Sequence, residues 1–286
     1  MKTWKLRLAI LLGILAAAYF AACVYVLVKQ EDILFDPTPI SEGAPAMDQP
    51  FEVFIPVGKG RDQGELHACW MLAADAAAPT FLYLHGKTHN NITHPEHAKW
   101  LQRLNYNVLM VDYRGFGKSR GGGTPTEAKV YEDAAAAWNY LTQKHGIEPQ
   151  HIFIYGHSLG AAIAVELATH HPDAAGLVAE SAFTSVSDMA NRDYWFLPTG
   201  WLLRLSFDSL PRVRTLKVPV LLIHGTQDEK VPCKMSEQLY ATAPEPKKLL
   251  LIRGGDHAHS PEIGRVEYDA AVTTFVQTQL NRSINQ

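Results

Sequence analysis

The 286 residues are enough for one large α/β domain or two small ones. Their charges are mixed, with a formal net charge of −3, and the chain has no basic tract and no acidic tail. This balance excludes the basic footprint of a nucleic-acid-binding protein, so we expect no nucleic-acid partner.

The first 29 residues predict a membrane anchor. Lys2, Lys5 and Arg7 precede an uncharged apolar run at 8–28, and about 20 such residues cross the hydrocarbon core of a bilayer as a helix. We therefore expect residues 1–29 to form an uncleaved single-pass anchor. Basic residues before a span favour a cytoplasmic N-terminus. The rest of the chain then lies outside the cytoplasm, in the periplasm if the organism is a Gram-negative bacterium.

Two other interpretations of this segment stay open. Residues 21–23, Ala-Ala-Cys, resemble a lipoprotein processing site with lipidation at Cys23. Against this, Phe20 is an unusual residue at the −3 position of such a site, and the apolar run continues after Cys23. A cleaved signal peptide or a buried helix also fits the composition. Residues 30–50, rich in Pro, Asp and Glu, predict an extended connector to the next domain.

Eight short segments have the apolar pattern of β-strands. The first two, 51–57 and 65–73, alternate in polarity as a half-exposed hairpin does, and we expect both to run antiparallel to the rest. Continuous apolar runs are typical of parallel strands buried on both faces. Six such runs follow, at 80–85, 107–112, 151–156, 175–181, 219–225 and 248–253.

Helical patterns alternate with these strands. They lie at 96–104, 126–145, 158–171, 233–243 and 266–280. The alternation predicts an α/β fold over residues 51–286, with a mostly parallel sheet flanked by helices. One interval, 182–218, has no strand pattern but is rich in aromatic residues, and we interpret it as a lid or cap inserted in the sheet.

A serine stands between two glycines where a predicted strand becomes a helix, in GHSLG at 156–160. This pattern is typical of a nucleophile elbow. The turn there is so tight that the residues two positions before and after the serine must be small, and the serine Oγ projects above the sheet. A plain strand-turn-helix connection has the same pattern, so Ser158 needs a matching acid and base elsewhere.

Functional residues of a doubly wound sheet gather at the carboxyl ends of its strands. Asp228 follows the strand at 219–225, and His257 follows the strand at 248–253. The chain order Ser158, Asp228, His257 is one of the known orders of a serine-hydrolase triad. In such a triad the histidine accepts the serine proton and passes it to the leaving group, and the aspartate fixes the imidazole tautomer.

The same chemistry requires backbone N–H groups for the oxygen that becomes negative in the transition state. We assign one to Leu159, directly after the nucleophile. We assign the second to Lys87, in the loop after the strand at 80–85.

Neighbouring residues compete for these roles. His259 lies in the same loop as His257, and the pattern alone does not separate them; the motif favours His257. Asp256 is interpreted as a turn residue, and Glu229 is expected to point away from the site.

Other polar residues are given structural roles. We expect His157 to be structural and Arg114 to brace its loop. The histidines at 89, 94 and 97 form a loose cluster without a carboxylate or cysteine to complete a ligand set, so we expect no metal site.

Over roughly residues 50–280 the sequence resembles the α/β-hydrolase superfamily, in its branch with a small lid and an N-terminal anchor. The motifs are LHG at 84–86, DYRGFGKS at 112–119, GHSLG at 156–160, ESAFTS at 180–185, PVLLIHGTQDEKVP at 219–232 and GGDHAHS at 254–260. The resemblance implies an α/β-hydrolase fold, the triad Ser158, Asp228 and His257, and no metal or organic cofactor. Similar members often have Asn and small residues after HG, where this chain has Lys87, Thr88 and His89.

Relatives in that branch are lysophospholipases, monoacylglycerol lipases, protein depalmitoylases and serine aminopeptidases. We therefore expect a membrane-anchored serine hydrolase of carboxylic esters, acting on a small-molecule or lipid ester. A peptidase or amidase with the same triad is the alternative, with Glu180 as a candidate for holding a substrate amino terminus. A non-catalytic binding protein is a third. The oligomeric state is not predicted.

Overall fold

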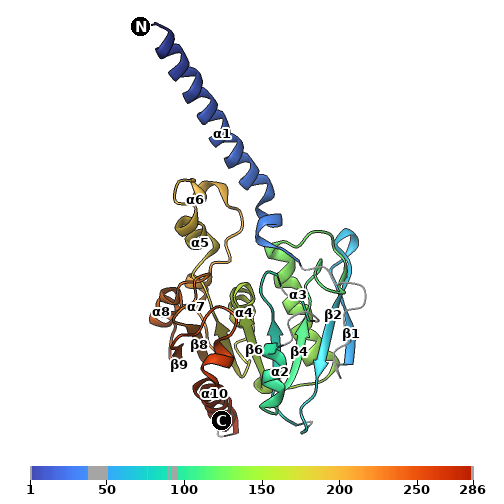
Figure 1. Ribbon diagram of the computed structural model, residues 1–286. Coiled ribbons are helices and arrows are strands. Elements are labelled where there is room, and N and C mark those ends of the chain that lie inside the picture. The colour runs from blue at the N-terminus through green and yellow to red at the C-terminus, as the bar shows by residue number, and fades with distance from the viewer. Residues whose placement is uncertain (1, 38–50, 76, 89, 92–95, 285–286) are drawn as a thin grey trace.

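The computed structural model describes residues 2–37, 51–75, 77–88, 90–91 and 96–284. Within these ranges the chain forms a nine-stranded sheet with helices on both faces, and the long helix α1 (Lys2–Leu34) projects from this domain (Figure 1). The architecture confirms the expected α/β fold with a mostly parallel sheet.

The strands follow the order β1-β2-β4-β3-β6-β7-β8-β9, and β5 pairs with β2. Their bounds are β1 Phe51–Val57, β2 Gly64–Met71, β3 Thr80–Leu84, β4 Asn107–Val111, β5 Arg120–Gly121, β6 Ile152–His157, β7 Gly176–Glu180, β8 Val220–Gly225 and β9 Lys247–Ile252. From β4 to β9 along this path, each strand is parallel to the next.

The expectation that β1 and β2 both oppose the parallel strands was wrong for β1. β2 pairs antiparallel with both β1 and β4. Because a hairpin reverses the chain once, only one of its strands can run against the others. β1 therefore runs in the same direction as the parallel strands.

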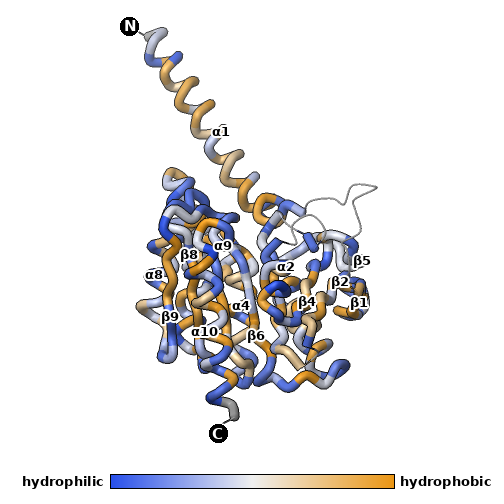
Figure 2. Tube along the Cα trace, turned by 60° about the horizontal axis from the view of Figure 1, so that its bottom comes forward, coloured by the Kyte–Doolittle hydropathy of each residue, from blue (hydrophilic) through white to orange (hydrophobic). Residues whose placement is uncertain are grey.

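Helices cover the two faces of the sheet. After α1, the α-helices of the described residues are α2 Glu96–Arg103, α3 Glu127–Asn139, α4 Leu159–His170, α5 Val186–Asp193, α6 Thr199–Leu202, α7 Ser209–Val213, α8 Cys233–Thr242, α9 Ser260–Ile263 and α10 Arg265–Ile284. Side chains alternate along a strand, and in β3 Leu82 and Leu84 pack on the face covered by α3 and α4. Phe81 and Tyr83 pack on the face covered by α2 and α10. Figure 2 shows the hydrophobic strands between these layers.

One predicted helix, 126–145, ends earlier than expected as an α-helix. α3 stops at Asn139, and the chain continues as one π-helical turn over Tyr140–Lys144. Gly146 follows with a positive φ and ends the turn.

The interval predicted as a lid, 182–218, contains α5, α6 and α7 and no strand, and the structure describes all of it. α7 belongs to the body of the domain, since Ser209 and Val213 are buried. α5 and α6 project beside α1 (Figure 1) and bury only Thr199. The part that protrudes is therefore shorter than the interval predicted as a lid.

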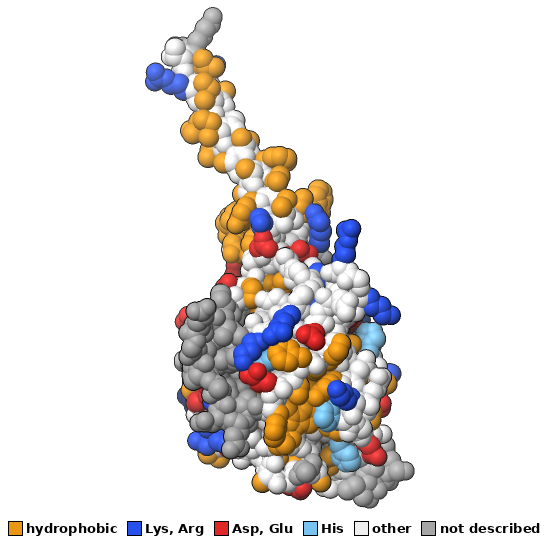
Figure 3. Space-filling model, turned by 90° about the vertical axis from the view of Figure 1, so that its right-hand side faces the viewer, with side chains coloured by type: hydrophobic (Ala, Val, Ile, Leu, Met, Phe, Trp, Pro, Cys, Tyr) orange, Lys and Arg blue, Asp and Glu red, His pale blue; other side chains and the backbone are white. Residues whose placement is uncertain are grey.

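α1 is the one helix of the described residues long and apolar enough to span a membrane. Its most apolar stretch has a mean hydropathy of 2.4 and is unburied. Figure 3 shows hydrophobic side chains along its length and basic ones at its N-terminal end. A signal sequence also meets these criteria of length and composition, so the anchor stays a prediction.

The connector predicted as extended over 30–50 was wrong at its beginning, because α1 continues to Leu34. The end of the helix is stabilised by contacts with the domain, because Gln30 and Phe35 are buried there. Phe35, directly after α1, packs edge-on against Phe116 and Phe207. The rest of that connector, 38–50, lies outside the described residues.

Candidate active site

Ser158 lies at the turn between β6 and α4. Its φ is +57° and its ψ is −118°, a conformation that L-residues rarely adopt and that is found at strained functional turns. A Cβ at Gly156 would collide with the Gly160 carbonyl oxygen, and one at Gly160 with the Leu84 carbonyl oxygen. The chain therefore requires glycine on both sides of the serine, as an elbow does.

Gly160→Ala is expected to disrupt this turn. The new Cβ would also lie 2.6 Å from the His85 carbonyl oxygen, so the elbow and the loop after β3 must move apart. Overpacking of this kind lowers the free energy of unfolding by about 1–3 kcal/mol. Thermal unfolding measures the loss. Gly200→Ala, where nothing lies within 4 Å, is the matched control; equal stability of the two variants would contradict the packing argument.

The structure brings Ser158, His257 and Asp228 together. Ser158 Oγ lies 3.1 Å from His257 Nε2, and His257 Nδ1 lies 2.7 Å from Asp228 Oδ2. His257 follows β9 and Asp228 follows β8, as the strand-tip argument requires. The three side chains come from separate loops and form one continuous chain of hydrogen-bonding atoms.

Asp228 is held as a carboxylate. Burial by itself raises the pKa of its carboxyl, but hydrogen bonds from His224 and His257 outweigh burial and hold the pKa well below its usual range. The backbone N–H groups of Lys230 and Val231 also donate to Oδ1, at 3.0 and 2.8 Å. A permanently charged acid is what the histidine needs for a stabilised imidazolium.

Sequence reasoning missed His224. It ends the buried strand β8, and its Nε2 lies 3.2 Å from Asp228 Oδ2 and 2.9 Å from the Val231 carbonyl oxygen. Its Nδ1 lies 2.6 Å from Ser236 Oγ. The sequence feature that could have indicated its role is a polar residue, His224, near the carboxyl end of the otherwise apolar run 219–225.

The loop after β3 lies against the nucleophile. A Cβ built at Gly86 would be 3.5 Å from the Cβ of Ser158. The Tyr113 hydroxyl donates to the His85 carbonyl oxygen at 3.1 Å and braces the loop. Leu159 is the first residue of α4, where a backbone N–H has no partner within the helix. The oxyanion roles of Leu159 and Lys87 stay predictions.

His157 ties the acid-base loop to the elbow. Its Nε2 lies 2.7 Å from the His257 carbonyl oxygen, and because a carbonyl only accepts, Nε2 must carry the proton. Burial lowers the pKa of His157 to about 3, and the charge of His97 adds to this effect. His157 is thus a neutral donor beside the triad, in agreement with a structural role.

Glu180 and His97 form an ion pair beneath the elbow. Their Oε2 and Nε2 atoms are 3.4 Å apart. Burial alone raises the pKa of Glu180, but the charge of His97 outweighs it and lowers the pKa to about 2. Burial lowers the pKa of His97, and Glu180 reverses this and raises it. Two hydroxyls, of Tyr155 and Tyr268, also donate to Glu180.

The suggestion that Glu180 holds a substrate amino terminus was wrong. Its side chain is fully buried and its charge is already paired. Of the loose histidine cluster, positions 89 and 94 lie outside the described residues. His97 pairs with Glu180, and its ring lies beside that of His157, with ring centroids 4.9 Å apart and the planes tilted by 37°.

The low pKa of His157 predicts a loss of stability in acid. Its ordinary value is 6.5 and its folded value is about 3, so between these pH values the unfolded chain takes up a proton that the folded chain does not. At pH 4.5 this lowers the free energy of unfolding by about 3 kcal/mol relative to neutral pH. Glu180 adds a further loss as its unfolded form protonates near pH 4.5.

His157→Gln is expected to flatten this dependence between pH 7 and about 4.5. The glutamine amide can still donate to the His257 carbonyl but cannot take up a proton. Unfolding followed at several pH values measures the slope, and His259→Gln, on an exposed histidine, is the matched control. A slope as steep in His157→Gln as in the wild type would contradict the assignment.

The remaining predicted residues lie away from the reacting groups. His259 is exposed and its Nδ1 lies 3.0 Å from Asp256 Oδ2, so it is His257 that reaches Ser158. Glu229 is exposed. Arg114 is buried and its Nε lies 2.6 Å from Asp133 Oδ1, which confirms its role in bracing the loop.

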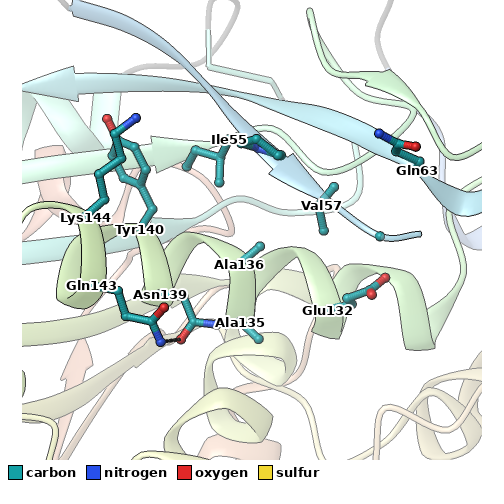
Figure 4. Close-up of a pocket in the computed structure, with 12 residues that line it drawn as sticks. Ile55, Val57, Gln63, Glu132, Ala135, Ala136, Asn139, Tyr140, Gln143 and Lys144 are labelled. Atoms are coloured by element: carbon teal, nitrogen blue, oxygen red, sulfur yellow. Dashed lines mark hydrogen bonds between the residues drawn. The ribbon is translucent and has the colours of Figure 1, made fainter. Parts of the chain in front are cut away.

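A surface pocket lies between β1 and α3, away from these residues (Figure 4). It is lined by Ile55, Pro56, Val57, Gly58, Gln63, Glu132, Ala135, Ala136, Asn139, Tyr140, Gln143 and Lys144. None of them is Ser158, His257 or Asp228 or belongs to the loop after β3, so this pocket is separate from the candidate active site.

Comparison with known proteins places the chain among hydrolases. A family model described as "Serine aminopeptidase, S33" matches residues 75–211. "Uncharacterized protein YfhR" of Escherichia coli O157:H7 is 36% identical over 214 residues, 73% of this chain and 73% of its own length. "Alpha/beta hydrolase domain-containing protein 17B" of Xenopus laevis is 33% identical over 159 residues, 54% of this chain and 51% of its own.

Among solved structures, the Pyrococcus furiosus esterase Pf2001 is similar with a TM-score of 0.68. The match covers 86% of this chain and 98% of the esterase, at 20% identity. At this identity the likeness shows a shared fold.

Proposed function

The chain belongs to the α/β-hydrolase superfamily, and from this premise we propose that it is a membrane-anchored serine hydrolase that cleaves carboxylic esters through an acyl-enzyme. The observation that carries the proposal is the continuous Ser158–His257–Asp228 chain of hydrogen-bonding atoms at a strained elbow.

In the first half-reaction, Ser158 Oγ attacks the ester carbonyl carbon while His257 Nε2 takes the hydroxyl proton. The carbonyl oxygen becomes negative and is met by the backbone N–H groups of Leu159 and Lys87. The imidazolium is stabilised by Asp228 and then gives its proton to the departing alcohol. An ester of Ser158 remains.

In the second half-reaction, a water molecule replaces the alcohol. His257 takes a proton from the water, whose oxygen attacks the acyl carbon. The tetrahedral intermediate collapses, and His257 returns the proton to Ser158 Oγ. The carboxylic acid leaves and the free enzyme is restored.

The favoured substrates are apolar acyl esters. The connection between the protruding helices α5 and α6 carries exposed Trp195 and Phe196, and α6 carries exposed Trp201. These side chains suit an apolar ligand or a lipid surface. α1 supports a location at a membrane, with the catalytic domain outside the cytoplasm because the basic residues precede the span.

The test is hydrolysis of p-nitrophenyl esters from acetate to palmitate by the full chain in detergent, beside Ser158→Ala. Turnover that disappears in the variant supports the proposal, and the preferred chain length separates a small-ester esterase from a lipase-like enzyme. A folded wild type with no turnover on any ester contradicts the proposal.

A peptidase on the same triad is the second candidate, because the matching family model is described as a serine aminopeptidase. It requires a site for the substrate amino terminus, and Glu180 is buried and paired. Aminoacyl p-nitroanilides compared with the esters decide between the two. Faster cleavage of the anilides would favour the peptidase.

A further inference from the structure

The tip formed by residues 194–203 is an exposed apolar surface. Its ten residues, YWFLPTGWLL, carry no charge. Trp201 is 92% exposed and Trp195 is 81% exposed, and more than half of the Phe196 and Tyr194 surface is also exposed. Single exposed apolar residues are ordinary, but a contiguous patch marks an interaction site.

Two contacts hold this tip against α1. The Tyr19 hydroxyl donates to the Phe196 carbonyl oxygen at 2.9 Å. Buried Gln30 donates to the Leu202 carbonyl oxygen at 3.4 Å, and it accepts from the backbone N–H groups of Arg204 and Leu205, directly after the tip, at 2.6 and 3.2 Å. The contacts are eleven residues apart on α1, about 16 Å along its axis. The tip therefore lies beside the helix and not beyond its end, as Figure 1 shows.

The position of Tyr19 along α1 determines how deep the contacting part of the tip would lie in a bilayer. The apolar run of α1 ends at Val28, nine residues or about 13 Å beyond Tyr19. A hydrocarbon core is about 30 Å thick. If the run 8–28 fills this core, Tyr19 and the Phe196 carbonyl that it contacts lie close to the middle of the core. Gln30, which contacts the Leu202 carbonyl, lies just beyond the outer edge of the core. The tip therefore spans the outer half of the core.

We propose that the aromatic tip, residues 194–203, inserts into the outer leaflet beside α1, so that its occupant is the phospholipid bilayer. The inference rests on the membrane anchoring in the proposed function. Tryptophan and tyrosine prefer the interface between acyl chains and headgroups. The end of the tip held by Gln30, where Trp201 adjoins Leu202, lies at that level, and the deeper residues of the tip carry no charge, as the acyl-chain region requires. Charged residues, Asp193 and Arg204, flank the tip in the sequence.

The same helix is tied to the candidate active site. After α1, Phe35 is buried in the core, and the Asp36 N–H donates to the Lys87 carbonyl oxygen at 3.2 Å. Anchor, aromatic tip and the loop after β3 are thus connected by direct contacts. Insertion of the tip fixes the height of the domain above the bilayer and directs the enzyme to ester substrates that reside in the membrane.

The test uses tryptophan fluorescence of the full chain in phosphatidylcholine–phosphatidylglycerol vesicles with or without brominated acyl chains. Trp4→Phe leaves Trp195 and Trp201 as the exposed reporters, because the other three tryptophans are buried in the domain. Trp195→Phe/Trp201→Phe leaves Trp4, on α1, as the exposed reporter and is the matched control. The triple variant gives the background to subtract.

We expect brominated lipid to quench most of the emission of Trp195 and Trp201. We expect iodide dissolved in the water to quench these two residues weakly, because the bilayer shields them. Quenching of Trp4 without quenching of the two tip residues overturns the inference and leaves the anchored hydrolase standing. Quenching of neither reporter overturns both the inference and the anchor. Fluorophosphonate labelling of the same samples reports separately on the hydrolase.

Discussion

Replacing Ser158 with alanine is expected to lower kcat for ester hydrolysis by about 10⁶-fold, the size of effect found when the nucleophile of a serine-hydrolase triad is removed. Without Oγ there is no atom 3.1 Å from His257 Nε2 to attack the carbonyl carbon. The remaining rate reflects the oxyanion groups and substrate binding alone. Initial rates with p-nitrophenyl butyrate, corrected for the uncatalysed reaction, measure the loss.

Because Ser158 has a strained backbone, the variant must be shown to be folded, and thermal unfolding provides this control. Alanine adds no atom to the turn and leaves Gly156 and Gly160 in place, so a midpoint of thermal unfolding at or above that of the wild type is expected. A folded Ser158→Ala protein that keeps a tenth or so of the wild-type kcat would assign the chemistry to another residue.

Asp228→Asn is expected to lower kcat by about 10⁴-fold near neutral pH. The amide has nearly the shape of the carboxylate but can present an N–H to His257 Nδ1, which then stabilises the wrong imidazole tautomer. It also removes the negative charge that stabilises the imidazolium. The pH profile of kcat/KM measures both effects, and the variant is expected to recover part of its activity at high pH.

The control for this variant is Glu229→Gln, on the adjacent and exposed carboxylate. Its kcat is expected to stay within about twofold of the wild type, because surface charges away from the reacting groups have small effects. If Glu229→Gln loses as much activity as Asp228→Asn, the acid of the triad has been assigned to the wrong residue.

Local patterns predicted most of the strands and the juxtaposition of the triad. Continuous apolar runs marked the parallel strands, and in a parallel sheet their carboxyl ends meet at one edge. The proximity of Asp228 and His257, which are nearly thirty residues apart in the sequence, could therefore be predicted without any knowledge of side-chain positions. The glycines beside Ser158 were predictable for the same reason, since the turn itself demands them.

Contacts between distant segments were not predictable. Nothing local in the sequence indicates that Gln30 binds the backbone at Arg204, or that His97 pairs with Glu180. Both contacts depend on how the folded loops lie in three dimensions. The wrong direction of β1 has a simpler origin, because alternation of polarity reports burial and carries no information on strand direction.

The most direct test of the central claim is to locate the covalent adduct. The full chain in detergent is treated with a fluorophosphonate, digested, and analysed by tandem mass spectrometry. We expect a single adduct on Ser158, absent after heat denaturation and strongly reduced in His257→Ala, because the hydroxyl is nucleophilic only beside its base. An adduct on a different residue, or no adduct on a folded wild-type protein, would contradict the assignment of Ser158 as the nucleophile.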